Sequence, residues 1–331
     1  MRQRGNTGAN TVHSPILQTT EQRTQRRKSW RYLREHYLLY LMSIPGLAVI
    51  IVFKIVPLYG LTLAFKDFNI FAGENIMDSI LLSPWVGLDH FQSIFTRPEF
   101  LQIISNTIVI SVYKLVFLFF PPILLSLLLN EVRSTGFKRT VQTLVYMPHF
   151  LSWAVVFGLF YTLLGNYGAL NQLLAALGWE KISFFTDSDL FRSLLVVSEG
   201  WKEIGWSAIV FLAAMTSISP DLYEAARIDG ANRYQRMWHI SIPGILPVIV
   251  LIFIMKVGHI LNAGFEQVLA MYNPAVYDVA DIIQTYVYRV SLGRMDFSVG
   301  TGFGLFESVI AFILIVGSNA VCRRVLGRSI W

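Results

Sequence analysis

The sequence predicts an all-α membrane protein with six transmembrane helices. Apolar residues make up 54% of the 331 residues and charged residues only 15%, which is too apolar for an ordinary soluble domain. A helix rising about 1.5 Å per residue needs roughly 20 apolar residues to cross about 30 Å of hydrocarbon. Runs of sufficient length lie near residues 38–63, 102–130, 140–163, 192–217, 245–270 and 303–322.

The distribution of basic residues predicts the orientation of these helices. Seventeen of the 27 Lys and Arg residues fall in alternate connecting segments and the two ends, and five fall in the other connections. Basic residues near helix ends are retained on the cytoplasmic side. Both termini are therefore predicted to be cytoplasmic, and this skew explains most of the net charge of +6 without an acidic ligand.

The chain is predicted to divide into a polar, basic cytoplasmic tail, residues 1–36, and a transmembrane domain, residues 37–331. The first apolar run begins only after Leu38 and is too long for a cleavable signal, so we expect an uncleaved anchor. Cys322 is the single cysteine, which excludes an internal disulfide and a cysteine-based metal cluster.

The second, third and sixth spans contain isolated ionisable residues. Lys114 and Glu307 are lone charges in apolar runs, and we expect each to pair with a neighbouring helix. In the third span His149 follows Pro148, which should kink the helix because proline removes a backbone hydrogen bond. No further His or carboxylate lies at a metal-ligand spacing from His149, so no metal site is predicted.

The fourth span carries a polar stripe at helical spacing. Its members are Glu199, Lys202, Glu203 and Trp206, which share one face of a helix. A polar and aromatic face suits a sugar, which offers hydroxyls and an apolar ring face. An internal ion pair between Lys202 and Glu199 or Glu203 is an equally good interpretation.

The fifth span carries a broader polar face, predicted to run outward from the middle of the membrane. We select Lys256, Asn262, Glu266 and Gln267 as its candidate substrate-path residues, next to His259 and Ala263. Packing against another subunit would explain this face about as well as substrate contact.

A polar insert, residues 218–243, separates the fourth and fifth spans. Ser219 can cap a helix that begins at Pro220, Asp221 complements the helix dipole, and Gly230 suits a left-handed stop. The insert reads Glu224-Ala225-Ala226, three residues, then Gly230, and nine residues later Ile240-Ser241-Ile242-Pro243. We predict a short, well-terminated helix on the cytoplasmic side.

This spacing resembles the EAA loop of ABC importer permeases, with Ile242 in place of the usual Leu. Four further segments resemble the carbohydrate-uptake, maltose-permease-like branch that imports complex oligosaccharides: residues 86–91, 146–153, 200–206 and 297–301. The resemblance covers the chain from about residue 38 and implies the type I ABC importer transmembrane fold. It also implies that Glu224, Ala225, Ala226, Asp229, Gly230 and Pro243 couple the subunit to an ATPase.

The resemblance implies a bacterial inner-membrane transport subunit rather than an enzyme. Its expected partners are a second, homologous permease subunit, two ATP-binding subunits, an extracytoplasmic solute-binding protein and a carbohydrate. No Gly-Lys-Ser/Thr phosphate loop occurs in the chain, so ATP and Mg are expected on the ATPase, and no cofactor or nucleic acid is expected on this chain.

Two alternatives remain open from the sequence. An ion-coupled secondary transporter of a polar solute would also place charged residues inside helices. Within the sugar importers, relatives of this branch take up uronates such as alginate or oligogalacturonide. Lys202, Lys256 and Arg289 could neutralise a uronate carboxylate, but Glu199, Glu203 and Glu266 could equally cancel those charges.

Overall fold

The computed structural model describes residues 35–327, and most of these residues lie in helices. The only strand-like pairing among them is an isolated bridge between Lys66 and Trp85. Five helical segments are long and apolar enough to cross a membrane, and a sixth span results if α9 and α10 are taken together. The all-helical prediction with six spans is therefore confirmed, whereas the predicted tail, residues 1–36, lies almost wholly outside the described residues.

The chain separates into two compact units, residues 1–61 and 62–331. The described part of the first unit is one helical rod. It begins as α2 (Tyr37–Ile50), passes through a π-helical turn (Ile51–Ile55) and continues as a 3-10 helix (Val56–Phe65) that extends into the second unit. Pro45 and Pro57 lie in this rod, where each lacks the N–H that a regular α-helix would use.

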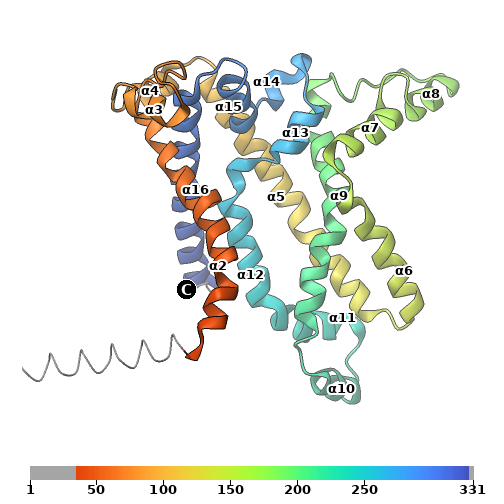
Figure 1. Ribbon diagram of the computed structural model, residues 1–331. Helices are drawn as coiled ribbons and strands as arrows, with labels where there is room; N and C mark the ends of the chain where they lie inside the picture. The colour runs from red at the N-terminus through yellow and green to blue at the C-terminus, as the bar shows by residue number, and fades with distance from the viewer. Residues whose placement is uncertain (1–34, 328–331) are drawn as a thin grey trace, which may run out of the picture. The chain divides into compact units, whose positions relative to one another are not determined.

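The second unit is a bundle of long helices with short helices at both ends (Figure 1). Its long helices are α5 (Phe100–Glu131), α9 (Ser188–Met215), α12 (Ile242–Gly258) and α16 (Phe297–Leu326). At one end lie α3 (Ile76–Leu82), α4 (Asp89–Thr96), α13 (Phe265–Met271), α14 (Tyr277–Ala280) and α15 (Ile283–Ser291). At the opposite end lie α10 (Pro220–Ile228) and α11 (Arg233–Arg236).

The core of this bundle forms where α5, α9 and α12 meet. Toward the α10 end, Phe119, Phe211 and Ile245 belong to one buried cluster, with one residue from each helix. Toward the other end, Ile110 of α5 and Leu195 of α9 are buried together with residues of α13 and α14. Two polar-lined regions, one within the bundle and one at its α10 end, are thereby held in fixed positions on long helices.

The third predicted span, residues 140–163, is not one helix. It is divided into α6 (Thr135–Tyr146), a 3-10 turn (Met147–Phe150) and α7 (Trp153–Leu164), which is followed by α8 (Ala169–Ala176). Pro148 stands in the first turn of the 3-10 segment, and the Ser152 side chain caps α7. The kink expected at Pro148 is therefore a complete break, because a new helix N-terminus is capped four residues later.

The fifth predicted span, residues 245–270, is also divided. The helix α12 starts after a π-helical turn (Met237–Ser241) and ends at Gly258. Ala263 and Gly264 both adopt left-handed backbone conformations, with φ of 49° and 79°, which stop a right-handed helix. The prediction that the polar residues of 256–267 share one helical face is therefore wrong.

Candidate functional site

The insert between α9 and α12, which contains α10, has the local structure that its sequence predicts. The Ser219 hydroxyl accepts a hydrogen bond from the Asp221 N–H at 3.3 Å, and Pro220 occupies the first helical position of α10. Gly230 has φ of 80°, and its N–H donates to the Arg227 carbonyl at 3.1 Å. These contacts satisfy backbone groups at both ends of a short helix, so α10 is capped at each end.

The helix α10 presents its surface away from the bundle core. It bends by 79° from α9, and no residue in it is buried. Glu224 and Ala225 are exposed, Ala226 is half-buried, and Asp229 and Gly230 are exposed at its end. Leu222 and Ile228 expose 55% and 86% of their surfaces, so charged and apolar side chains are both available to a partner here.

The other side of α10 borders a polar recess whose anchors the sequence did not indicate. Arg236 is 7% exposed and pairs with Glu131 at 3.0 Å, which ties α11 to the end of α5. Tyr223 and Ser241 share a hydrogen bond at 3.0 Å, and Pro243 stands in the first turn of α12. The recess has a volume of 450 Å³ and includes Glu224. The Arg236–Glu131 ion pair and the Tyr223–Ser241 hydrogen bond thus fix the base of the insert, and α10 extends away from the bundle.

A second cavity, of 360 Å³, lies within the bundle where α12 ends. We call it the inner cavity; its lining residues come from three helices and the break after α12: Ser111, Lys114, Leu115 and Leu118, Glu199, Lys256, His259, Ile260, Asn262, Ala263 and Gly264. Of the predicted substrate-path residues, the structure therefore brings Glu199, Lys256 and Asn262 together at one place.

Lys114 organises the wall of the inner cavity. Its ammonium group lies 2.5 Å from Glu199 Oε2, donates to the Ala263 carbonyl at 2.8 Å, and donates to Gln267 Oε1 at 2.5 Å. A Cβ atom on Gly264 would collide with the Lys114 ammonium. Lys114 therefore joins α5, α9 and the break before α13, as expected for an interhelical partner.

Gln267 is part of this wall rather than of an open path. It is fully buried, and its amide donates to the Leu195 carbonyl at 2.7 Å and to Ser198 Oγ at 2.8 Å. Glu266 is exposed on α13 and is not among the lining residues of the inner cavity. The break after α12 rotates these two residues away from Lys256 and Asn262.

The residues of the polar stripe predicted on α9 do lie on one helix, but they contact two different regions: the inner cavity and the segment around His149. Glu199 faces the inner cavity, whereas Glu203 hydrogen-bonds His149 Nδ1 at 2.8 Å and lies 3.2 Å from the Lys202 ammonium. Trp206 stacks on the His149 ring with centroids 4.3 Å apart. The ion pair between Lys202 and Glu203 was one of the two interpretations left open, and the structure contains it.

His149 was expected only at a kink, and its partners were not foreseen. The carbonyl of His149 accepts a hydrogen bond from Lys202 at 2.5 Å. Thus the broken third span is fastened to α9 through both the ring and the backbone of one residue. The sequence gives no signal for this contact, because it depends on the break that follows Tyr146.

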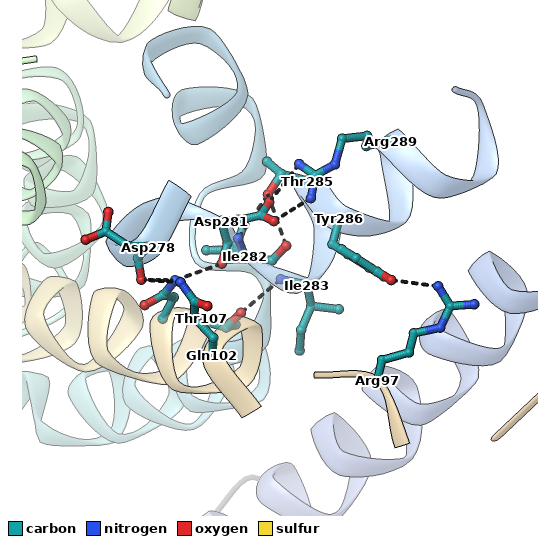
Figure 2. Close-up of polar contacts among 11 residues, drawn as sticks. Arg97, Gln102, Thr107, Asp278, Asp281, Ile282, Ile283, Thr285, Tyr286 and Arg289 are labelled. Atoms are coloured by element: carbon teal, nitrogen blue, oxygen red, sulfur yellow. Dashed lines mark hydrogen bonds and ion pairs between the residues drawn. The ribbon is translucent and has the colours of Figure 1, made fainter. Parts of the chain in front are cut away.

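Polar contacts also fasten the end of the bundle opposite α10 (Figure 2). Arg289 forms a two-point ion pair with Asp281, with distances of 3.2 and 2.6 Å. Hydrogen bonding to Asp281 raises the pKa of the Arg289 guanidinium, which therefore stays charged. Asn106 of α5 donates to the Asp278 and Asp281 carbonyls, at 3.0 and 3.2 Å. The Arg289 charge is thus already neutralised within the chain.

Lys256 differs from the other basic residues considered for a sugar acid. Within residues 35–327, Lys202 and Arg289 each have a carboxylate partner. No ion pair to Lys256 is found in that part of the chain, and its side chain is exposed. Lys114 and Lys256 both line the inner cavity, and with Lys114 paired to Glu199, Lys256 is the lysine there without an ion-pair partner among the described residues.

Comparison with known proteins shows the family to which the chain belongs. Residues 122–328 match the family described as "Binding-protein-dependent transport system inner membrane component". Protein LplB of Bacillus subtilis (strain 168) is 42% identical over 88% of this chain and 90% of its own. The polygalacturonan/rhamnogalacturonan transport system permease protein YteP of the same organism is 43% identical over 89% of this chain and 90% of its own.

Solved structures show the same fold. A chain in the crystal structure of a bacterial ABC transporter involved in the import of the acidic polysaccharide alginate has a TM-score of 0.81 and 38% identity. The comparison covers 90% of this chain and 99% of that one. The chain described here therefore belongs to the family of binding-protein-dependent transport system inner membrane components, the non-enzymatic membrane-spanning permease subunits of ABC transporters.

Proposed function

We propose that this chain is the membrane-spanning subunit of an ATP-driven importer of an oligo- or polysaccharide, and that the sugar is acidic. One observation carries the proposal. The single helix α9 contributes Glu199 to the inner cavity and leads directly into the bend before the exposed helix α10. A displacement of α10 by a partner would therefore be transmitted along a rigid helix to the wall of the cavity.

In this proposal α10 is the contact with a separate ATPase subunit, which binds ATP and Mg, and this chain carries no cofactor. Glu224, Ala225, Ala226, Asp229, Gly230 and Pro243 form or support the contact. Both chain termini and the α10 end lie on the cytoplasmic side, in accordance with the basic residues counted in the sequence. The complex contains a second permease subunit, two ATPase subunits and an extracytoplasmic binding protein.

The relatives and the inner cavity both support an acidic sugar as the transported molecule. YteP is named for polygalacturonan and rhamnogalacturonan transport, and the structural relative takes part in alginate import. Polygalacturonan and alginate both consist of uronate units, each of which carries a carboxylate. The cavity of this chain offers hydrogen-bonding groups and Lys256, which has no ion-pair partner among residues 35–327, and a cation there suits such a molecule better than a neutral sugar.

Uptake by the reconstituted complex tests this proposal. Proteoliposomes that contain ATP inside, with the binding protein outside, should accumulate labelled uronate oligomers and should do so without an ion gradient. Glu224→Lys should abolish accumulation because it reverses the charge on the exposed α10 surface, while the variant subunit still reaches the membrane. Accumulation that needs an ion gradient but no ATP would contradict the proposal and favour a secondary carrier.

A further inference from the structure

The inner cavity contains a group of hydrogen-bond donors that the protein itself leaves unused. The Ser111 hydroxyl is buried and has no hydrogen-bond partner among the described residues, and it belongs to the lining. Ser111 as a whole is only 5% exposed. A buried hydroxyl without a partner is costly, and it is usually satisfied by water or by a ligand.

Asn262 adds a second unused donor with a fixed direction. Its Oδ1 accepts hydrogen bonds from the N–H groups of Gly264 and Phe265, at 3.3 and 3.4 Å. Its Nδ2 donates to no group in residues 35–327, and the side chain lines the inner cavity. Because the turn fixes the acceptor atom, the amide NH₂ is the end left to face a ligand.

Lys256 supplies the charge. It lies in the last turn of α12, beside the break that forms the inner cavity, and it is exposed. An ammonium group inside a membrane span is costly unless it meets a partner or a hydrated cavity. The carboxylate in this cavity, Glu199, is held by Lys114 at 2.5 Å, so Lys256 has no counter-ion there within the described residues.

We propose that Lys256, Ser111 and Asn262 form a carboxylate-reading subsite, in which Lys256 pairs with a uronate carboxylate and the two neutral donors bind its oxygens or the ring hydroxyls. The Lys256 ammonium and the Asn262 NH₂ can only donate, and the Ser111 hydroxyl can donate as well as accept, so all three can bind the oxygens of a carboxylate; the positive charge of Lys256 favours an anion over a neutral sugar. The proposal rests on the proposed function and adds the residues that select for acid.

Lys114 and Gly264 position this subsite without taking part in it. Lys114 binds the Ala263 carbonyl and so holds the left-handed turn that carries Asn262. Because Lys114 neutralises Glu199 in an ion pair, Glu199 is not free to pair with Lys256. The buried ion pair thus keeps the second lysine available to a ligand.

The test compares uronate oligomers with their methyl esters, which lack the charge and differ otherwise only by one methyl group per unit. Uptake by proteoliposomes is measured for the wild-type complex and for Lys256→Gln. Both are given the same binding protein, so the preference of the binding protein for acid over ester is the same in both measurements. We expect the variant to lose about tenfold in its preference for acid over ester, as for the loss of one charge-assisted hydrogen bond. Lys256→Arg should retain most of the preference.

The matched control is Lys54→Gln, which removes an exposed lysine from another predicted span. It should leave the preference unchanged. If Lys256→Gln has the wild-type ratio of acid to ester uptake, the subsite is wrong while the importer proposal stands. If the wild-type complex imports only neutral sugars, both the subsite and the acidic substrate class are wrong, whereas absence of any ATP-driven uptake overturns the proposed function itself.

A second variant distinguishes charge reading from subunit packing. In Lys256→Cys, an aminoethyl methanethiosulfonate reagent restores an ammonium group and should restore the acid preference, whereas the neutral methyl reagent should not. The native Cys322 is buried, and the wild-type complex treated with each reagent is the control. Loss of the second permease subunit from Lys256→Cys, with recovery of the complex on aminoethylation, would assign Lys256 to the subunit interface and overturn the proposal.

Discussion

Substitutions at Gly230 give a graded test of whether the capped end of α10 matters for coupling. Gly230 has φ of 80°, and nothing lies within 4 Å of the position that a Cβ would take. Alanine therefore meets no steric obstacle and suffers only the left-handed backbone cost, about 1 kcal/mol, or roughly a fivefold loss in the population of the ordered turn. Asparagine tolerates this conformation better and should behave almost as glycine.

Proline at the same position should be far more severe. Its φ is fixed near −65°, it removes the N–H that bonds the Arg227 carbonyl at 3.1 Å, and it disfavours the helical conformation found at Asp229. The cost is about 3 kcal/mol or more. Because α10 has nine residues and none of them is buried, little tertiary packing opposes this loss.

The assay is ATP-driven uptake in proteoliposomes, normalised to the amount of assembled complex. We expect the order glycine, asparagine, alanine and proline, with at most a fivefold loss for alanine and no uptake for proline. The Gly230→Pro subunit should still insert into the membrane. Normal uptake by Gly230→Pro at normal subunit levels would refute the reasoning, because it would separate the geometry of α10 from transport.

Three other perturbations test the packing on which the sites depend. Gly205→Ala should destabilise the subunit by roughly 1–3 kcal/mol, because its Cβ would collide with the Val145 backbone, whereas Gly200→Ala meets a movable leucine side chain and should change thermal stability much less. Lys114→Met should cost about 3–5 kcal/mol in thermal unfolding by leaving Glu199 unpaired, and adding Glu199→Met should recover part of that loss; no recovery would contradict the ion pair. Trp206→Ala should reduce transport more than it reduces copurification of the ATPase, and the reverse result would assign the stacked pair with His149 to assembly.

Local signals in the sequence were enough to predict the helical insert. The Ser219 cap, Pro220 and the left-handed Gly230 act within a few residues, so the structure contains them as expected. The all-helical class and most of the apolar spans were likewise predicted, because length and hydropathy determine them, whereas the third and fifth spans lie at Trp153–Ala176 and Arg233–Gly258 rather than at 140–163 and 245–270.

The inner cavity could not be predicted because it depends on the break in the helix after α12, which the spacing of apolar residues in the sequence does not reveal. A continuous fifth helix would have placed Lys256, Glu266 and Gln267 on one face, but the left-handed turn at Ala263 and Gly264 redirects the chain. Ala263 is not a residue that signals such a turn; its carbonyl accepts a hydrogen bond from Lys114, which is distant in sequence. Ser111 gave no signal either, since a serine in an apolar helix commonly bonds its own backbone.

The most direct test of the central claim is ATP hydrolysis by the purified complex in lipid, measured with the binding protein empty and loaded. We expect uronate-loaded binding protein to stimulate hydrolysis in the complex that contains this chain, and Gly230→Pro to abolish that stimulation. Hydrolysis that stays the same with empty and loaded binding protein, or a purified chain that never retains an ATPase, would contradict the claim that α10 couples ATP hydrolysis to sugar import.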